Sequence, residues 1–284
     1  MKKSNTVSIV IPVYNEAAHL PACLEAISQQ TVRPYEVIVV DNNSTDETAA
    51  IAGSYDFVRV ITEKKQGVVH ARERGFNAAR GTVIGRIDAD TVIESDWVAR
   101  LQQLFADPSI GGVTGRVKYH DMALGRACNA VDFKIRTYLE NSLGDEVAMQ
   151  GANMALRRSV WRDARDLVCR EGGLHEDMDL SVHVHEAGHK VVFDPSMVAA
   201  IGYRQAESSY RKFAEYIMLS PKTYAMHGRT SQRRMYPACM AALVCFLLIK
   251  ALHRGYDKDA DKFSWVQLFS SPQQRVNPAT YVDY

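Results

Sequence analysis

Val83-Ile84-Gly85-Arg86-Ile87-Asp88-Ala89-Asp90 is a short apolar run that ends in two aspartates one residue apart. The run predicts a buried strand from 83 to 87, with the aspartates at its C-terminal end. Ligands of open α/β sheets bind at that end of the strands. Two neighbouring carboxylates favour a divalent cation, which commonly bridges to substrate phosphates. Asp-x-Asp alone also fits a turn with capping aspartates, so the rest of the chain must decide.

Alternation of strands and helices surrounds this run. Runs rich in β-branched residues predict strands at 7–11, 36–40 and 57–61, and apolar residues at helical spacing predict helices at 20–27 and 69–79. Such alternation is typical of βαβ units. We therefore expect an α/β fold with a mostly parallel sheet flanked by helices.

Polar loops follow three of these strands, at 14–16, 41–44 and 88–90. The carboxyl ends of parallel strands meet at one sheet edge, so these loops should converge. Their residues suit a nucleotide: an aromatic ring to stack on a base, a carboxylate to accept from a base N–H, two acids for a metal on a diphosphate, and nearby cations for base or phosphate (Tyr14, Asp41, Asp88, Asp90, Lys65 and Arg72). Each also has a plainer interpretation in packing or solvation, but the joint arrangement favours a nucleotide site.

Composition indicates a soluble globular protein. The chain has 284 residues, 46% hydrophobic and 24% charged, enough for one large α/β domain with an appendage. Its five cysteines are scattered without C-x-x-C spacing, which favours reduced thiols in a cytoplasm over a disulfide framework. The N-terminus is too polar for a signal peptide. A cytoplasmic location is therefore expected.

The region from residue 204 onward is basic, with 12 Lys+Arg against 6 Asp+Glu. This excess invites an anionic partner such as a lipid surface, and no motif supports nucleic acid. The apolar run 237–249 is shorter than the roughly 20 residues that span a bilayer. Three interpretations stay open: a buried helix, a peripheral membrane contact through 236–254, and a contact within a homo-oligomer.

Four blocks occur in a specific order and spacing: VSIVIPVYNE (7–16), EVIVVDNNSTDET (36–48), QGVVHARERGFNAARG (66–81) and IGRIDADT (84–91). Together they resemble the inverting glycosyltransferases of family 2, which have the GT-A fold. The resemblance continues at 150–158, 175–180 and 187–191, and it fades beyond Tyr203.

The resemblance implies a division of the chain. Residues 1–203 would form the GT-A domain, with a nucleotide-binding part at about 1–118 and an acceptor part at about 119–203. Apolar residues at helical spacing within 119–147 predict a helix beside the acceptor site. Residues 204–284 would form a helical, basic and membrane-peripheral region.

The resemblance also implies roles for matching residues. The nucleoside would be held by Pro12, Tyr14, Glu16 and Asp41, with Asn43 and Arg72 nearby. Asp88 and Asp90 would bind Mg²⁺ or Mn²⁺ on the sugar diphosphate, and Asp88 would also contact the nucleotide. Asp177 would be the general base, although from position alone its Glu-Asp pair equally fits N-terminal helix capping. The acceptor side would include Asn153, His175 and Glu176.

The implied activity is metal-dependent, inverting transfer of a single sugar from a UDP- or GDP-type donor to a hydroxyl of a glycan or lipid-linked acceptor. This would serve cell-envelope polysaccharide biosynthesis at the inner face of the cell membrane. The chain has no Gln-x-x-Arg-Trp motif of processive synthases, which favours transfer of one sugar. One departure is Glu73, where the family often has asparagine.

Two other functions compete with this interpretation. His185, Glu186 and His189 match the H-E-x-x-H pattern of zinc hydrolases, which requires both histidines on one continuous helix. Gly188 predicts a helix stop, and a strand is expected from Lys190, so the pattern argues weakly for zinc. The other alternative is a catalytically silent nucleotide-sugar-binding protein, against which the retained Asp88, Asp90 and Asp177 speak.

Overall fold

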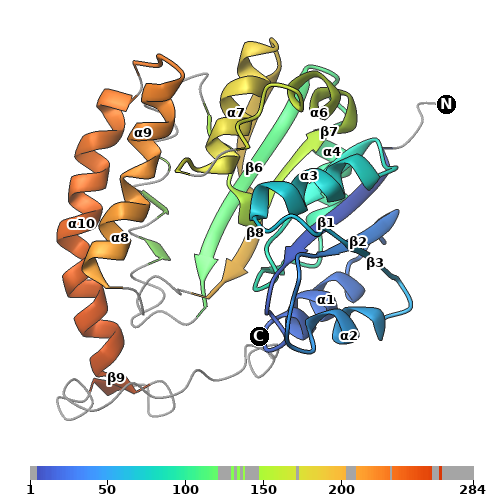
Figure 1. Cartoon of the computed structure of the whole chain (residues 1–284), viewed down its shortest axis with the longest axis horizontal. Helices are drawn as coiled ribbons and strands as arrows, with labels where there is room; N and C mark the ends of the chain where they lie inside the picture. The colour runs from blue at the N-terminus through green and yellow to red at the C-terminus, as the bar shows by residue number, and fades with distance from the viewer. Residues whose placement is uncertain are drawn as a thin grey trace.

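The computed structural model describes residues 5–120, 129–130, 133–134, 137, 147–170, 173–202, 209–230, 232–257 and 262–263. Most of the helix expected within 119–147 lies outside these residues. Within them, the fold is built on an eight-stranded mixed sheet with the strand order β3-β2-β1-β4-β7-β6-β8-β5 (Figure 1).

One half of the sheet is parallel. β1 pairs with β2 and β4, and β2 pairs with β3, all in parallel. The sequence patterns predicted these strands to within about two residues: β1 (Val7–Val13), β2 (Glu36–Asp41), β3 (Val58–Thr62) and β4 (Val83–Arg86). The strand expected at 83–87 therefore forms, and it ends two residues before Asp88.

The other half is mixed. β7 is inserted antiparallel between β4 and β6, β8 runs parallel to β6, and β5 pairs antiparallel with β8. These strands are β5 (Val92–Ile93), β6 (Ile110–Tyr119), β7 (Met154–Arg157) and β8 (Lys190–Ile201). Because β7 is antiparallel, its first residues lie beside the last residues of β4.

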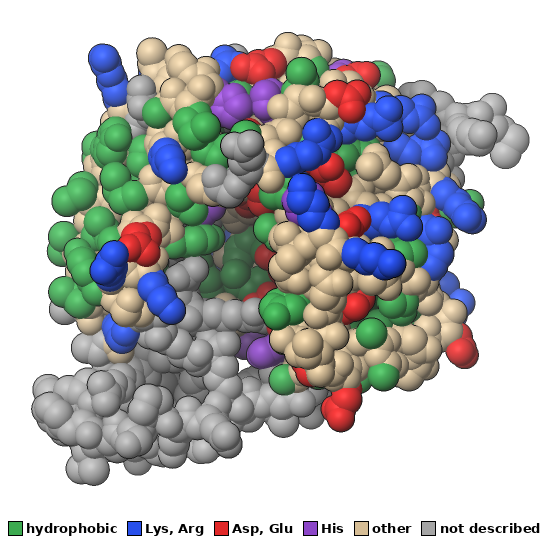
Figure 2. All heavy atoms as spheres, viewed as in Figure 1, with side chains coloured by type: hydrophobic (Ala, Val, Ile, Leu, Met, Phe, Trp, Pro, Cys, Tyr) green, Lys and Arg blue, Asp and Glu red, His purple; other side chains and the backbone are tan. Residues whose placement is uncertain are grey.

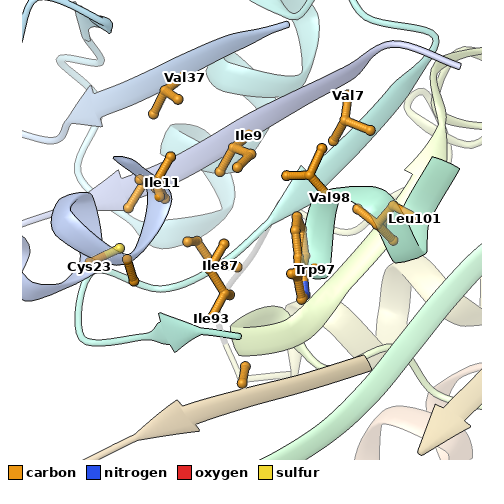
Figure 3. Close-up of a cluster of buried hydrophobic side chains, with 14 of the residues drawn as sticks. Val7, Ile9, Ile11, Cys23, Val37, Ile87, Ile93, Trp97, Val98 and Leu101 are labelled. Carbon is orange, nitrogen blue, oxygen red and sulfur yellow. The ribbon is translucent and has the colours of Figure 1, made fainter. Parts of the chain in front are cut away.

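Helices cover both faces of the sheet because β1 is apolar on both sides. Alternate side chains of a strand point to opposite faces. Ile9 and Ile11 pack with Trp97 in one core (Figure 3), whereas Val10 packs with Phe76 in the other. The helices of this layer are α1 (Leu20–Ser28), α2 (Thr48–Gly53), α3 (Val68–Ala78), α4 (Trp97–Leu104), α6 (Arg158–Ala164) and α7 (Glu176–Glu186), with the 3-10 turn η1 (Gly151–Asn153).

The C-terminal helices stand beside the sheet, next to α7 (Figure 1). They are α8 (Tyr210–Ile217), α9 (Leu219–Met226) and α10 (Gln232–Gly255), followed by the short antiparallel pair β9 (Tyr256–Asp257) and β10 (Lys262–Phe263). Phe213 of α8 stacks on Phe246 of α10 with ring centroids 4.1 Å apart. Within the described residues, no helix combines the length and apolar character that a membrane span requires.

Candidate active site

Loops from separate strands meet at the carboxyl edge of the parallel half of the sheet, as the sequence predicts. Side chains of the second loop receive the backbone of the first: Asn15 N–H donates to Ser44 Oγ (3.1 Å) and Glu16 N–H donates to Thr48 Oγ1 (2.8 Å). In return, Thr45 N–H donates to Asn15 Oδ1 (2.8 Å). The loops after β1 and β2 therefore form one unit.

The residues expected to hold the nucleoside lie in this unit. The Tyr14 side chain is 50% exposed, whereas Asp41 is buried and accepts a hydrogen bond from Ser44 N–H (3.3 Å). Asn43 has a left-handed backbone (φ 64°), and its amide donates to Lys64 O (2.9 Å), which joins the loop after β3 to the same unit. Pro12 is half-buried beside Val13.

Arg86, the one charged residue of the apolar run 83–87, is the centre of an ion network. Its Nη2 donates to Asp88 Oδ1 (3.0 Å) and its Nη1 to Glu176 Oε1. The other oxygen of Glu176 accepts from Arg72 Nη1, which also donates to Glu176 O (2.7 Å). This network ties β4, α3 and α7 together across 90 residues of sequence.

The pKa values follow from this pairing. Burial of the Arg86 guanidinium works against its charge, but the carboxylates of Glu176, Asp88 and Asp177 outweigh burial and raise its pKa. Burial likewise disfavours the charge on Glu176, yet Arg86 and Arg72 hold the pKa of this carboxyl below its ordinary value. Arg86 and Glu176 are therefore both ionised over the working pH range.

Arg72 lies beneath the site. Its side chain is fully buried, and its Nε and Nη2 have no hydrogen-bond partner among the described residues. The Arg72 side chain is therefore not part of a solvated helix face, which was the alternative to a role in the site. Glu73, its neighbour, instead pairs with Arg170 (3.0 Å).

Asp177 is fixed at the start of α7 by two backbone N–H groups. Gly151 N–H donates to Oδ2 and Met178 N–H donates to Oδ1, each at 2.9 Å. A Cβ at Gly151 would lie 2.2 Å from Arg86 Nη1, so a larger residue there would push the guanidinium away from its partners. Close packing of η1 against Arg86 thus brings Asp177 to the same ion network as Asp88.

Asp88 and Asp90 act on the same neighbour, Cys23 of α1. Burial raises the pKa of the Cys23 thiol, and the negative charges of Asp90 and Asp88 raise it further. Cys23 Sγ donates to Asp88 O at 3.7 Å.

Figure 2 shows the molecule hollowed between the strand ends and the C-terminal helices, with acidic side chains along the edge. A set of hard oxygen donors beside a hollow fits Mg²⁺ or Mn²⁺.

The acceptor-side predictions fare differently. Glu176 lies in the ion network, and His175 packs its ring edge-on against Tyr216 of α8 (centroids 4.7 Å apart). Asn153 is fully buried, and its amide is consumed internally: it accepts from Trp97 Nε1 (2.8 Å) and donates to Arg116 O and Met197 O (each 2.9 Å). Asn153 therefore braces the sheet behind the site and offers no atom to an acceptor.

The H-E-x-x-H motif does not form a metal site. α7 ends at Glu186, so His189 lies beyond the helix, after Gly188 with φ 80°. His185 Nε2 donates to Val147 O (2.9 Å), while His189 Nε2 pairs with Asp163 (2.9 Å). The two histidines are engaged in different places, and the zinc-hydrolase interpretation fails on geometry.

Sequence reasoning missed the roles of Arg86 and Gly151. A signal for Arg86 was present, because an arginine inside an apolar strand must find buried partners. Its partner Glu176 was not identifiable, since no local pattern links residues so distant. The backbone N–H of Gly151 carries no side-chain signal at all.

Comparison with known proteins agrees with this geometry. The chain is 27% identical over 250 residues to the glycosyltransferase AglE of Haloferax volcanii, covering 85% of this chain and 81% of AglE. It is 29% identical over 204 residues to the O-antigen chain rhamnosyltransferase RfbN of Salmonella typhimurium, covering 66% of this chain and 63% of RfbN. Among solved structures, its fold is similar to that of the mannosyltransferase PcManGT of Pyrobaculum calidifontis, in complex with GDP-Man and Mn²⁺ (TM-score 0.63, 19% identity, 89% of this chain and 72% of the other).

The family model described as "Glycosyl transferase family 2" matches residues 8–163, more than half of the chain. The matched region contains β1 to β4, the Asp88 and Asp90 pair, and Gly151. The fold is the mixed α/β fold of GT-A glycosyltransferases. This chain is a glycosyltransferase and belongs to glycosyl transferase family 2.

Proposed function

We propose that the enzyme transfers one sugar, with inversion, from a nucleotide-sugar donor to a hydroxyl group of a glycan or lipid-linked acceptor. The observation that carries the proposal is the Arg86 network, which draws Asp88 from the donor-side loops and Asp177 from α7 to one guanidinium. A donor diphosphate and an acceptor hydroxyl need those two carboxylates in one cleft.

The donor nucleoside lies over the joined loops after β1 and β2. Tyr14 stacks on the base with its exposed ring, and Asp41 accepts from a base N–H. Pro12, Glu16 and Asn43 shape the pocket around them. Arg72 is fully buried, so its part is to hold Glu176 in place beneath the pocket and not to contact the nucleotide itself.

Asp88 and Asp90 hold Mg²⁺ or Mn²⁺. The metal, when bound, neutralises the diphosphate and makes it a better leaving group. The protein's part is to present both acids from one short loop, with Arg86 fixing the position of Asp88. PcManGT, which has a similar fold, was solved with Mn²⁺, which supports a metal of this type.

Asp177 is the general base. Its two backbone hydrogen bonds leave lone pairs on both oxygens and fix the carboxylate for proton removal from the acceptor hydroxyl. The oxygen of the acceptor hydroxyl attacks the anomeric carbon of the donor sugar, and the bond from that carbon to the diphosphate breaks on the opposite side. A single displacement of this kind inverts the anomeric centre.

Replacing Asp90 with alanine should remove the gain in nucleotide affinity that Mn²⁺ provides. We expect the wild type to bind its nucleoside diphosphate at least about tenfold more tightly with Mn²⁺, and Asp90→Ala to bind equally with and without it. Calorimetric titration of UDP and of GDP, each with and without Mn²⁺, measures this and identifies the donor base.

Asp96→Ala is the matched control, because Asp96 is an exposed surface acid paired with Arg100. It should keep the Mn²⁺ effect in full. An Mn²⁺ effect that survives in Asp90→Ala would remove Asp90 from the site.

The acceptor is proposed to be presented at a membrane. α10 exposes a stripe of apolar side chains at helical spacing, all between 44% and 67% exposed: Tyr236, Met240, Val244 and Leu247. Figure 2 shows apolar side chains, bordered by Lys and Arg, over the C-terminal helices. Arg233 and Arg234 precede the stripe and Lys250 follows it. An apolar stripe with basic flanks fits the interface of an anionic bilayer.

RfbN, by its name, acts on an O-antigen chain, which is consistent with cell-envelope polysaccharide as the product class.

The full chain should cosediment with phosphatidylserine vesicles, more weakly with phosphatidylcholine vesicles, and less at high salt. Met240→Asp combined with Val244→Asp should lower binding at least about tenfold, because two charges would enter the apolar interface. Met226→Asp is the control: Met226 is equally exposed at the end of α9 but lies off the stripe. If the chain binds neither kind of vesicle, the stripe does not contact a membrane. If the chain is a dimer in solution and the double substitution dissociates it, the stripe is a contact between two copies of the chain.

A further inference from the structure

A second cluster of metal-ligating side chains lies between α7 and the end of α9, apart from the Asp88 and Asp90 pair. Asp179, His183 and His227 each offer one ligand atom, and these atoms all lie within 4.8 Å of one another. Asp179 and His183 share one face of α7 at the i, i+4 spacing, and His227 follows the last turn of α9. Figure 2 shows histidine and acidic side chains side by side over this part of the molecule.

The cluster converges on one carboxylate oxygen. Asp179 Oδ1 lies 2.9 Å from His227 Nε2 and 3.7 Å from His183 Nε2, and the Asp179 side chain is only 1% exposed. Its other oxygen accepts from Cys169 N–H (2.8 Å), which fixes the carboxylate. Ligand atoms around a tetrahedral Zn²⁺ lie about 3.3 Å apart at ordinary zinc–ligand distances. The two observed separations lie on either side of that value.

The outer contacts are those of a metal-ligating histidine. His183 Nδ1 lies 2.9 Å from Glu186 Oε2, and Glu186 Oε1 accepts from Arg229 Nη2 (3.1 Å). A carboxylate can only accept, so Nδ1 of His183 carries a proton and Nε2 is the ring nitrogen that is placed to bind a metal ion. Carboxylates that fix a histidine in this tautomer are typical second partners of metal ligands.

The spacing of the cluster leaves room for an ion. His183 Nε2 faces Asp179 Oδ1 at 3.7 Å, beyond hydrogen-bond distance. Imidazole nitrogen with one carboxylate oxygen is a donor set that suits zinc.

We propose that Asp179, His183 and His227 bind one Zn²⁺, separate from the donor metal, with a fourth position left for water. The ion joins α7, whose first residues are Glu176 and Asp177, to the connection between α9 and α10. Its role is therefore to brace the helix that carries the proposed base against the C-terminal helices. The site depends on a different histidine pair from the one that the H-E-x-x-H motif selects.

The test is zinc binding by the full chain carrying Asp90→Ala, so that the proposed donor site does not compete. After treatment with EDTA and dialysis, Zn²⁺ is titrated against a competing chelator. We expect one equivalent to bind. Further substitution of Glu186 with glutamine should weaken binding about 10- to 100-fold, and His227→Gln should weaken it more.

His189→Gln is the matched control. His189 belongs to the motif but pairs with Asp163 at the surface, so its loss should leave zinc affinity unchanged. Free Zn²⁺ about a hundredfold above its Kd should raise the Tm of the Asp90→Ala chain by roughly 5–10 °C. It should leave the Tm of the His227→Gln variant unchanged.

Co²⁺ in the otherwise unaltered cluster gives a readout that does not depend on the folding of the His variants. The Asp90→Ala chain with one equivalent of Co²⁺ should show the visible absorption of a four-coordinate nitrogen–oxygen site. Failure of this chain to take up one equivalent of Zn²⁺, a purely six-coordinate Co²⁺ spectrum, or equal loss of affinity in His189→Gln and His227→Gln would each overturn the proposal.

Discussion

Asp177→Asn should lower the turnover rate by about 10²- to 10⁴-fold, the usual contribution of a general base, while leaving donor affinity nearly unchanged. The asparagine can accept only one of the two backbone hydrogen bonds through its carbonyl oxygen, so a small loss of stability should accompany the kinetic effect. What is lost is the ability to take a proton from the attacking hydroxyl. The rate of nucleoside diphosphate release measures this even without an acceptor, because water can attack in its place.

If Asp177 only caps the helix, the same variant should behave differently. A first-turn acid that only stabilises the helix N-terminus contributes about 0.3–1 kcal/mol to folding and nothing to the chemical step. Asp163→Asn, at an exposed acid paired with His189, is the control for the general effect of removing a charge. If Asp177→Asn releases nucleoside diphosphate at the wild-type rate and only its Tm falls, Asp177 is a helix residue and the base lies elsewhere.

Glu176→Gln should destabilise the fold by about 3–5 kcal/mol, the usual loss when one partner of a buried ion pair is removed. Glu176 has a side chain that is 14% exposed and neutralises two arginines that are 0% and 4% exposed. Glutamine leaves Arg72 without its carboxylate partner and Arg86 with the charges of Asp88 and Asp177 only. Urea denaturation with an unchanged m value measures the loss.

Glu94→Gln is the matched control for this variant. Glu94 is 54% exposed and pairs with Lys118 at the surface, so its replacement should cost less than about 1 kcal/mol. Equal losses in the two variants would show that the buried network adds nothing to stability.

The stabilisation from Glu176 also has a defined pH dependence. Its pKa in the folded protein lies below the ordinary value of 4.5, so folding favours the ionised form. The gap in unfolding free energy between wild type and Glu176→Gln should be full above about pH 4.5 and shrink as the pH falls through the folded-state pKa.

Local patterns predicted the donor half of the molecule well. The β-branched run that becomes β1 and the apolar run that ends at Asp88 are each sufficient to define a strand. Parallel strands share an edge, so the meeting of the loops at Tyr14, Asp41 and Asp88 follows without further information. The roles given to these residues in donor and metal binding stay predictions, as does the domain division at residue 203, close to Ile201, where the eight-stranded sheet ends.

Tertiary pairing explains what the sequence could not give. Period-two alternation is the same in either strand direction, so the antiparallel insertion of β7 was hidden. Asn153 sits in a matching block, but three partners from distant elements consume its amide. His183 and His227 meet only because α9 packs on α7, whereas the sequence motif pointed to His185 and His189.

The reversed course of β7 has an evolutionary consequence. β7 starts where β4 stops, and the chain that leaves β6 at Tyr119 is back in the core at Val147 and Met149, just before η1. These two ends place few demands on the sequence between them. We therefore expect related chains to differ more between Tyr119 and Val147 than in β1, β4 or η1.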